Sequence, residues 1–312
     1  MSFTSEIKNE LARVQNEKPC CDLAQLSGFI CFAGSVIYKD SAPQLKITTE
    51  SEVAAKRCLS LMKRIFSPQN SFEFIKSRSG ILTLFIENAE TVHEILEKLG
   101  LYDDEFSEHI TFRVNKKLTK QQCCKRAFVR GAFLGGGSAV NPEKGYHLEF
   151  VTHHSALSGG LEELFAYFSL GAKTVKRKSN YVTYFKNSED ISDVLSIIGA
   201  HKNMMEFANV RIVKDTRNNV NRKVNCETAN LDKTLNAAFL QIEAIEKIKK
   251  AGKFEILPES LAEAARLRLE NPDASLSTLA ELSKTGVSRS GLSHRLKKLT
   301  EIAADLMEKN YG

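Results

Sequence analysis

The sequence has no apolar run that approaches the roughly 20 residues needed to cross a bilayer as a helix. Its first stretch, MSFTSEIKNELARV, predicts an amphipathic helix and has none of the charged-then-apolar order of a secretory signal. We therefore expect a cytoplasmic protein with no membrane partner.

The sequence also has no C-x-x-C spacing, although it contains seven cysteines. Closely spaced cysteines of that kind are the usual signature of a structural zinc site. Cys20–Cys21 and Cys123–Cys124 are adjacent pairs instead, and the odd total does not fit a framework of paired disulfides. On spacing alone we expect reduced, buried thiols, as in the cytoplasm, with no metal and no cofactor.

The chain is long enough, at 312 residues, for two or three domains, and its hydrophobic content of 42% is sufficient for buried cores. Its net charge of +6 is compatible with an anionic partner such as nucleic acid. Because a modest net charge does not identify a partner, the positions of the basic residues have to decide.

Two parts of the sequence repeat. A shift of 103 residues places LSGFICFAGS (26–35) on VRGAFLGGGS (129–138), with glycines and a serine in register. A shift of 100 residues places ILTLFIE (81–87) on YVTYFKN (181–187). Several matches in the same order indicate an internal duplication.

Each copy has the pattern helix, strands, helix, strands, helix. Alternation and β-branched or aromatic content predict strands in SVIYKD, FEFIKS, ILTLFIE and YVTYFKN, and helical spacing predicts helices at 51–65 and 88–99. We therefore expect an α+β domain over 1–208, duplicated with pseudo-twofold symmetry, with half repeats at about 1–112 and 113–208.

The C-terminal part has a different composition. Residues 209–230 are polar and rich in asparagine, which predicts a surface linker. An all-α domain over 231–312 is expected to follow, opening with a helix over about 231–250. Proline, serine and glycine punctuation then predicts three further helices, the second at about 277–283 and the third capped by Ser288.

The last two of these helices, with their glycine-containing turn, predict a helix-turn-helix at about 275–309. From Lys284 to Lys298 there are five Lys/Arg and no acidic residue, which favours DNA binding over an ordinary charged helix surface. Ala280 and Ser288 are eight residues apart, longer than in a tight helix-turn-helix, so individual contacts stay open. We expect the DNA-binding face to begin at Ser288 and Lys298 to contact phosphate. The residues expected to contact bases are Arg289, Ser290, Ser293, His294 and Lys297.

Four stretches occur in order over nearly the whole chain: MSFTSEIKNELARV, RGAFLGGGSAVNPEKGYHLEF, NRKVNCETANLDKT and LPESLAEAARLRLENPDASLSTLAELSKTGVSRSGLSHRLKKL. Together they resemble WhiA, a bacterial DNA-binding protein family. The resemblance implies a duplicated unit similar to a LAGLIDADG homing endonuclease, followed by a helix-turn-helix. It also implies a role in cell division, chromosome segregation or sporulation, as a transcriptional regulator or a chromosome-associated factor in the nucleoid.

In a LAGLIDADG endonuclease, an acidic residue at the base of each motif helix holds the divalent metal for hydrolysis. Laid on this sequence, the acidic positions are occupied by Ala33 and Gly136, which cannot ligate a cation. The resemblance therefore implies a scaffold that has lost its catalytic residues and its metal. The remaining motif glycines are expected to permit close helix packing at the pseudo-twofold seam: Gly28, Gly34, Gly131 and Gly137.

Other interpretations of these stretches are weaker. No lysine follows Gly136 or Gly137, as a P-loop requires, and QCCKRAFVRGAF predicts a helix where a dinucleotide fingerprint needs a strand. Adjacent His153 and His154 would point to opposite faces of a strand. Two basic runs, 113–130 with seven Lys/Arg and 173–178 with four, fit either a solvated surface or DNA phosphates laid across the sheets.

We therefore expect a non-enzymatic protein whose partner is double-stranded DNA, with no small-molecule substrate. Two alternatives stay open. One is a metal-dependent endonuclease that recruits other acids, such as Glu50 or Glu149. The other is a scaffold whose duplicated unit binds another transcription factor.

Overall fold

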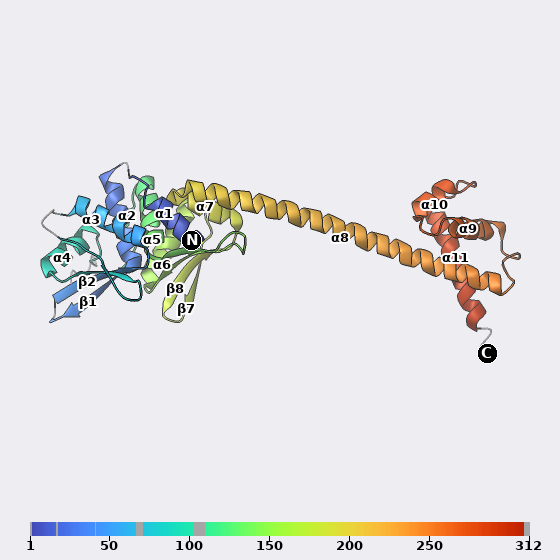
Figure 1. Ribbon diagram of the computed structural model, residues 1–312, viewed down its shortest axis with the longest axis horizontal. Coiled ribbons are helices and arrows are strands. Elements are labelled where there is room, and N and C mark those ends of the chain that lie inside the picture. Colours follow the sequence, from blue (N-terminus) through green and yellow to red (C-terminus); the bar gives the residue numbers. More distant parts are fainter. Residues whose placement is uncertain (1, 17, 41, 67–70, 103–109, 309–312) are drawn as a thin grey trace. The chain divides into compact units, whose positions relative to one another are not determined.

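The computed structural model describes residues 2–16, 18–40, 42–66, 71–102 and 110–308 (Figure 1). It divides into two compact units, one up to Lys214 and one from Asp215 onward. Each unit has its own cluster of buried apolar side chains.

The N-terminal unit begins with α1 (Phe3–Leu11) and then runs twice through the same order of elements. This repetition confirms the predicted duplication. The first copy is α2 (Pro19–Ala33), β1 (Gly34–Lys39), β2 (Ala42–Thr49), α3 (Glu52–Ile65), β3 (Ile75–Lys76), β4 (Leu82–Ile86) and α4 (Ala89–Lys98). The second copy is α5 (Gln122–Gly136), β5 (Gly137–Ala139), β6 (Leu148–Thr152), α6 (Ser155–Tyr167), β7 (Lys173–Arg177), β8 (Asn180–Phe185) and α7 (Ser188–Ile198).

Each copy forms an antiparallel four-stranded sheet, and the two sheets have equivalent strand orders, β1-β2-β4-β3 and β5-β6-β8-β7. The register is repeated as well. Gly34 pairs with Ile47 in the first sheet and Gly137 pairs with Phe150 in the second, and both pairs are related by the shift of 103 residues found in the sequence.

The helices α2 and α5 lie side by side at the centre of this unit, where the two copies meet (Figure 1). Most residues of both helices are buried, because the helices are covered by each other, by the sheets and by the outer helices. Phe29 and Ile30 of α2 and Phe128 and Phe133 of α5 are each at most 1% exposed. The seam between the copies is thus the interior of one continuous core.

The C-terminal unit is all helical. Apolar side chains of α8 (His201–Lys250) near its end pack with α9 (Glu259–Glu270), α10 (Leu276–Leu282) and α11 (Arg289–Glu308). The predicted buried stripe of α11, Leu292, Leu296 and Leu299, is fully buried in this core. None of the helices in the described part of the chain is both long and apolar enough to span a membrane.

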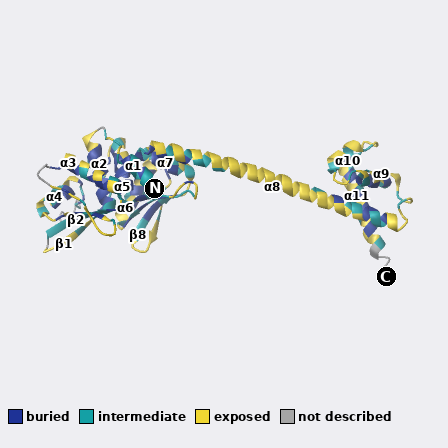
Figure 2. Ribbon diagram, viewed as in Figure 1, coloured by how far each residue is buried: buried dark blue, intermediate teal, exposed yellow. Residues whose placement is uncertain are grey.

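The predicted linker at 209–230 is wrong as irregular structure, because α8 is a continuous helix from His201 to Lys250. Asparagine disfavours helix interiors, which motivated the linker prediction. The stretch contains no glycine or proline, however, so no residue in it interrupts the helix. At the start of α8, the carboxylate of Glu10 accepts hydrogen bonds from the backbone N–H groups of Lys202 and Asn203. Most residues of the middle of α8 are exposed (Figure 2).

Candidate nucleic-acid interface

The helices α10 and α11 begin where their capping residues predict. The Ser275 hydroxyl accepts a hydrogen bond from the N–H of Thr278, and the Ser288 hydroxyl accepts one from the N–H of Gly291. Between them, Gly286 has a φ of +64°, a left-handed conformation that glycine adopts without strain. The turn over residues 283–288 is therefore closed by specific local interactions.

Glu263 of α9 holds this turn in place through its carboxylate. Its carboxylate accepts hydrogen bonds from the hydroxyls of Ser283 and Thr285, each at about 3.0 Å, and lies 3.4 Å from Arg295 of α11. Partial burial opposes ionisation, but these hydrogen bonds and the Arg295 charge hold the pKa of Glu263 below its usual range. The glutamate thereby ties the turn and α11 to α9, which sets the orientation of the exposed face of α11.

Every residue expected to contact DNA is exposed. Ser288, Arg289 and Ser290 lie at the start of α11, and Ser293, His294, Lys297 and Lys298 follow on the side opposite its buried leucines. Ser288 also caps the helix, so its hydroxyl is already engaged. Lys298 lies 3.3 Å from Glu301, an exposed pair of little energetic weight.

Arg295 does not belong to this face, although it contributes to the basic count of the sequence. It is half-buried and directed toward Glu263. The basic side chains exposed from Lys284 to Lys298 are thus four: Lys284, Arg289, Lys297 and Lys298.

Two of the four motif glycines lie where α2 and α5 approach most closely. A Cβ on Gly28 would overlap the Phe128 carbonyl oxygen, and a Cβ on Gly131 would overlap the Gln25 carbonyl oxygen. Both obstacles are backbone atoms of the opposite helix. Side chains cannot be accommodated there without moving the helices apart.

The expected seam role of Gly34 and Gly137 is wrong. The atoms nearest to a Cβ at these positions belong to the last turn of the glycine's own helix, at Ile30 and Phe133. Both glycines end their helix in extended backbone and begin the next strand. Gly135 is the third seam glycine instead, since a Cβ there would lie 2.7 Å from the Phe29 carbonyl oxygen. The motif alignment did not predict this role, because it assigned helix packing to Gly137 and not to Gly135.

Ala33 and Gly136, expected above to stand where an endonuclease has its metal-binding acids, are the last residues of α2 and α5 and are half-buried. A Cβ on Gly136 would lie 2.7 Å from the Val151 carbonyl oxygen and 3.0 Å from the Phe32 ring. A side chain at Gly136 would therefore have to displace the Val151 carbonyl or the Phe32 ring.

The two acids of the nuclease alternative have different surroundings. A cavity of about 780 Å³ is lined by Glu50, Ala33 and Lys8, among other residues. Burial lowers the pKa of Lys8 to about 8, and the charge of Glu50 partly offsets this. Glu149 lies on β6, 3.0 Å from His147 and 3.7 Å from Arg177.

The repeat does not place the two acids at equivalent positions. The shift of 103 residues that relates the copies places Lys46 opposite Glu149 and His153 opposite Glu50. Among the described residues, the one cluster of three or more Cys, His, Asp or Glu side chains close enough to share an ion is a group of cysteines elsewhere in the unit.

The first basic run, 113–130, divides into two classes of residue. Arg130 is only 9% exposed and donates hydrogen bonds to the Ile198 carbonyl and to Asn16. Lys125 donates to the carbonyls of Thr119 and Lys120. These side chains stabilise the fold and are not available for phosphates. The exposed basic residues of the run are Lys116, Lys117, Lys120 and Arg126.

The second basic run lies on β7, the edge strand of the second sheet, and on the residue after it, and all four of its basic residues are exposed. Arg177 lies 3.7 Å from Glu149, and this pairing partly neutralises the positive charge of Arg177. The sheets thus carry cations, but fewer of them are unengaged than the sequence count indicates.

A test of the former metal site follows from these contacts. We expect the variant Ala33→Asp/Gly136→Asp to bind no magnesium or manganese and to be less stable than the wild type by about 1–3 kcal/mol, since the added side chain overpacks its surroundings. Thermal unfolding and calorimetric metal titration measure the two effects. Ala33→Asp alone is the matched control, and stoichiometric metal binding by the double variant would contradict the expectation.

Comparison with known families covers both units. A family model described as the WhiA N-terminal LAGLIDADG-like domain matches residues 19–102, and one described as the WhiA LAGLIDADG-like domain matches residues 125–217. A third, the WhiA C-terminal HTH domain, matches residues 220–303. The boundaries of these matches follow the two copies and the helical unit.

Similar proteins extend the match to the full length. A probable cell division protein WhiA from Alkaliphilus metalliredigens is 43% identical over 97% of this chain and 98% of that protein. One from Clostridium botulinum is 39% identical over 99% of this chain and all of that protein. A crystal structure of full-length DUF199/WhiA from Thermotoga maritima matches with a TM-score of 0.59 and 27% identity over 98% of this chain and 99% of that one. The chain, with two LAGLIDADG-like copies and a helix-turn-helix domain, belongs to the WhiA family.

Proposed function

We propose that this protein binds double-stranded DNA through the exposed face of α11 and acts as a transcriptional regulator or chromosome-associated factor. The observation that carries the proposal is this face itself. Arg289, His294 and Lys297 are exposed on one side of a helix whose other side is fully buried. A rigid helix with a basic, hydrogen-bonding face is the arrangement by which helix-turn-helix domains enter the major groove.

The roles of individual side chains follow from their chemistry. Arg289 offers a planar fork of donors that matches the edge of guanine, and Ser290, Ser293 and His294 offer shorter polar groups along the same side. Lys297 and Lys298 lie about two turns beyond Arg289 along α11. Lys298 suits a phosphate, and Lys297, which is also placed to reach a base edge, adds a second positive charge that attracts the DNA backbone. Ser288 serves the helix cap first and DNA second.

We propose a non-enzymatic role for the LAGLIDADG-like unit. The absence of a carboxylate at Ala33 and Gly136, and the contacts that block a side chain at Gly136, support this. The exposed lysines of 113–130 and of β7 support auxiliary, sequence-independent phosphate contacts. Docking of another transcription factor on this unit is the second candidate, favoured by the exposed Ile37, Ile75 and Phe85 of the first sheet.

The cellular setting is proposed from the relatives. Proteins that match over the full chain are named probable cell division proteins. We infer a nucleoid-associated protein of the cytoplasm that acts in cell division, chromosome segregation or sporulation.

The lysine Lys297 provides the first test. With the full chain and a short labelled duplex, affinity should fall steeply with salt, and Lys297→Ala should weaken binding several-fold and reduce the slope of log K against log salt by about 1. Fluorescence anisotropy at four or five salt concentrations measures both. Lys253→Ala is the matched control, since Lys253 is exposed in the loop before α9. Equal affinities for wild type and Lys297→Ala would remove α11 from the interface.

Arg289 provides the test of base readout. Arg289→Ala should weaken binding to a preferred site by about 1–3 kcal/mol while leaving binding to unrelated duplexes almost unchanged. Selection of bound sequences from a random pool, with wild type and variant side by side, measures the loss of preference at one or two base pairs. A uniform loss over all sequences would make Arg289 a phosphate contact.

A further inference from the structure

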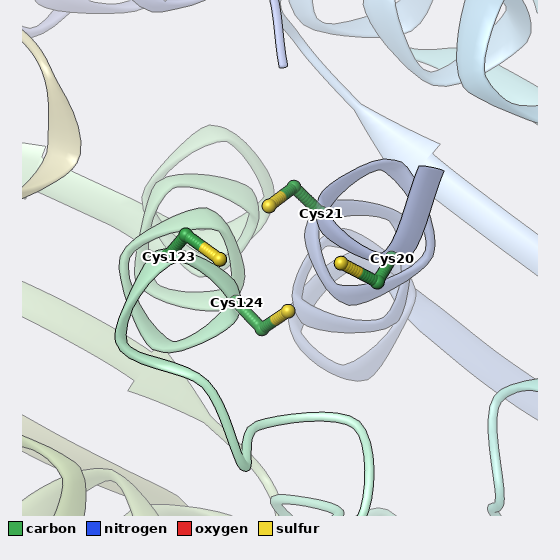
Figure 3. Close-up of side chains that lie close together, drawn as sticks. All are labelled: Cys20, Cys21, Cys123 and Cys124. Carbon is green, nitrogen blue, oxygen red and sulfur yellow. The ribbon is translucent and has the colours of Figure 1, made fainter. Parts of the chain in front are cut away.

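Four cysteines converge where α2 and α5 begin (Figure 3). Cys20 and Cys21 come from α2, and Cys123 and Cys124 come from α5. All four Sγ atoms lie within 4.8 Å of one another. The seven cysteines are all free thiols, so none of these four is engaged in a disulfide.

The repeat explains why the four thiols meet. The shift of 103 residues that relates the copies places Cys20 on Cys123 and Cys21 on Cys124. Each pair occupies the second and third positions of its helix, after Pro19 in α2 and Gln122 in α5. Each copy contributes two adjacent cysteines from the first turn of its central helix. The pseudo-twofold relation between the copies therefore brings four cysteine side chains together.

This symmetry is also that of a tetrahedron. A twofold axis through a tetrahedral centre exchanges its four ligands in two pairs, which is the relation between the cysteines of α2 and those of α5. Zinc bound by four thiolates has Zn–S distances of about 2.3 Å, which places the sulfurs about 3.8 Å apart. The observed Sγ separations, up to 4.8 Å, exceed this value by no more than about 1 Å. A four-iron cluster would hold its cysteine sulfurs around a larger centre.

The charges around the thiols suit an anionic metal centre. Zinc with four thiolates carries a net charge of −2, and two helix N-termini, each with a partial positive charge, point at it. Arg126 and Lys18 border the same cavity as Cys21 and Cys123. The site is therefore electropositive before any metal binds.

We propose that Cys20, Cys21, Cys123 and Cys124 bind one Zn²⁺ ion as a structural site that joins the two copies of the duplicated unit. On binding, each thiol gives up its proton to solvent and its sulfur becomes a ligand, so the protein's four S–H bonds are exchanged for four Zn–S bonds. The site does not depend on the proposed DNA-binding function.

This site is distinct from the metal positions of a LAGLIDADG endonuclease. Cys21 precedes Ala33 by 12 residues, and Cys124 precedes Gly136 by 12 residues. At the rise of an α-helix, this separation is about 18 Å along α2 and α5. The former catalytic positions lie at the C-terminal ends of the two helices and the cysteines at their N-terminal ends.

The remaining cysteines lie apart from this cluster and supply a control. Cys31 and Cys58 are fully buried, and burial raises the pKa of the Cys31 thiol to about 12. Cys226 is exposed on α8. It has no part in the cluster, and its replacement should leave metal binding unchanged.

The test is the metal content of the full chain, purified with reductant and zinc and then freed of loosely bound metal. We expect about one zinc per chain in the wild type and in Cys226→Ser, and less than about a tenth of that in Cys20→Ser/Cys123→Ser. A mercurial titration should release the zinc in step with about four thiols per ion. Cobalt in place of zinc should give the absorption of a tetrahedral thiolate site.

Two further measurements keep the proposal open to refutation if the double variant misfolds. Cys20→His retains a ligand atom and should keep its zinc with an altered cobalt spectrum. Removal of zinc from the wild type by a chelator should lower the unfolding temperature, and zinc should restore it. A wild-type protein without stoichiometric zinc, or one whose zinc content equals that of Cys20→Ser/Cys123→Ser, would overturn the proposal. Disulfides among these four cysteines in a metal-free protein would also overturn it.

Discussion

Replacing Gly131 with valine is expected to destabilise the N-terminal unit by about 3 kcal/mol or more, at the upper end of what overpacking costs. Thermal or urea unfolding of the full chain, followed by a probe in the N-terminal unit, measures the loss. A change of this size is a large part of the stability of an ordinary domain. Gly28→Val should act in the same way, since the two positions are equivalent in the repeat.

The size of this effect follows from which atoms stand in the way. A Cβ on Gly131 would overlap the Gln25 carbonyl oxygen and would lie 2.9 Å from the Phe29 nitrogen. These are backbone atoms of α2, so no rotamer change can relieve the overlap. The helices would have to separate, and the surrounding core, with Phe29, Phe128 and Phe133 almost fully buried, would lose contacts along its length.

Gly159 in α6 supplies the matched control. It is a helical glycine, and a Cβ added there would meet no atom within 4 Å apart from those of its own helix. Gly159→Ala should therefore stabilise the unit by up to about 1 kcal/mol, because alanine has the higher helix propensity. Gly131→Ala should destabilise it. If both alanine variants change stability in the same direction, close backbone approach at Gly131 is not what requires glycine there.

The packing of α2 against α5 could be predicted only in part from the sequence. The repeat shift predicted the two copies, and the motif alignment predicted that glycines of α2 and α5 would meet. It could not separate Gly131, which faces the opposite helix, from Gly137, which ends its own helix. That distinction depends on which face each position presents after packing, and a motif read as a string of letters does not contain it.

The meeting of the four cysteines could not be predicted from local spacing. The spacing rule for zinc sites considers cysteines close in sequence, whereas Cys20 and Cys123 belong to different copies and meet only through the pseudosymmetry of the fold. The available signal was that both adjacent pairs obey the shift of 103 residues. Burial was also overestimated, because Cys20 and Cys226 are exposed and Cys123 is half-buried.

The linker prediction for 209–230, which is part of α8, was wrong because it relied on local composition alone. Local composition favoured a linker, but a helix without glycine or proline continues when its two ends are held. Phe207 near the start of α8 and Ile245 and Ile248 near its end are buried. The helix-turn-helix, in contrast, is specified locally by Ser275, Gly286 and Ser288, and its elements begin within about one or two residues of the prediction.

Replacing Arg268 with leucine is expected to destabilise the C-terminal unit by about 3 kcal/mol, because Gln241 and three carbonyl groups of the loop after α9 lose their shared hydrogen-bond donor. Arg268 lies in α9 and is 1% exposed. Burial lowers the pKa of its guanidinium, which has no ion-pair partner among the described residues. Its hydrogen bonds are the reason it is tolerated in the core.

These hydrogen bonds hold together three parts of the domain. Nε donates to the side chain of Gln241 in α8, at 3.0 Å. Nη1 donates to the carbonyls of Asn271, Pro272 and Ala274, the last at 2.7 Å. The three carbonyls belong to the loop that leads into α10. Arg268 therefore fixes the first helix of the helix-turn-helix to α9 and to the end of α8, without touching the exposed face of α11.

That separation makes the prediction specific. Arg268→Leu should lower the unfolding temperature of the C-terminal unit while the N-terminal unit keeps its own, and DNA affinity should stay close to that of the wild type at low temperature and fall as the unit unfolds. Arg266→Leu is the matched control, because Arg266 lies in the same helix, is half exposed and, within the described part of the chain, has Glu259 as its one ion-pair partner. It should change stability by no more than about 0.5 kcal/mol. If the two variants are equally stable, the buried guanidinium does not hold the loop, and if Arg268→Leu loses DNA binding while folded, the arginine also shapes the recognition helix.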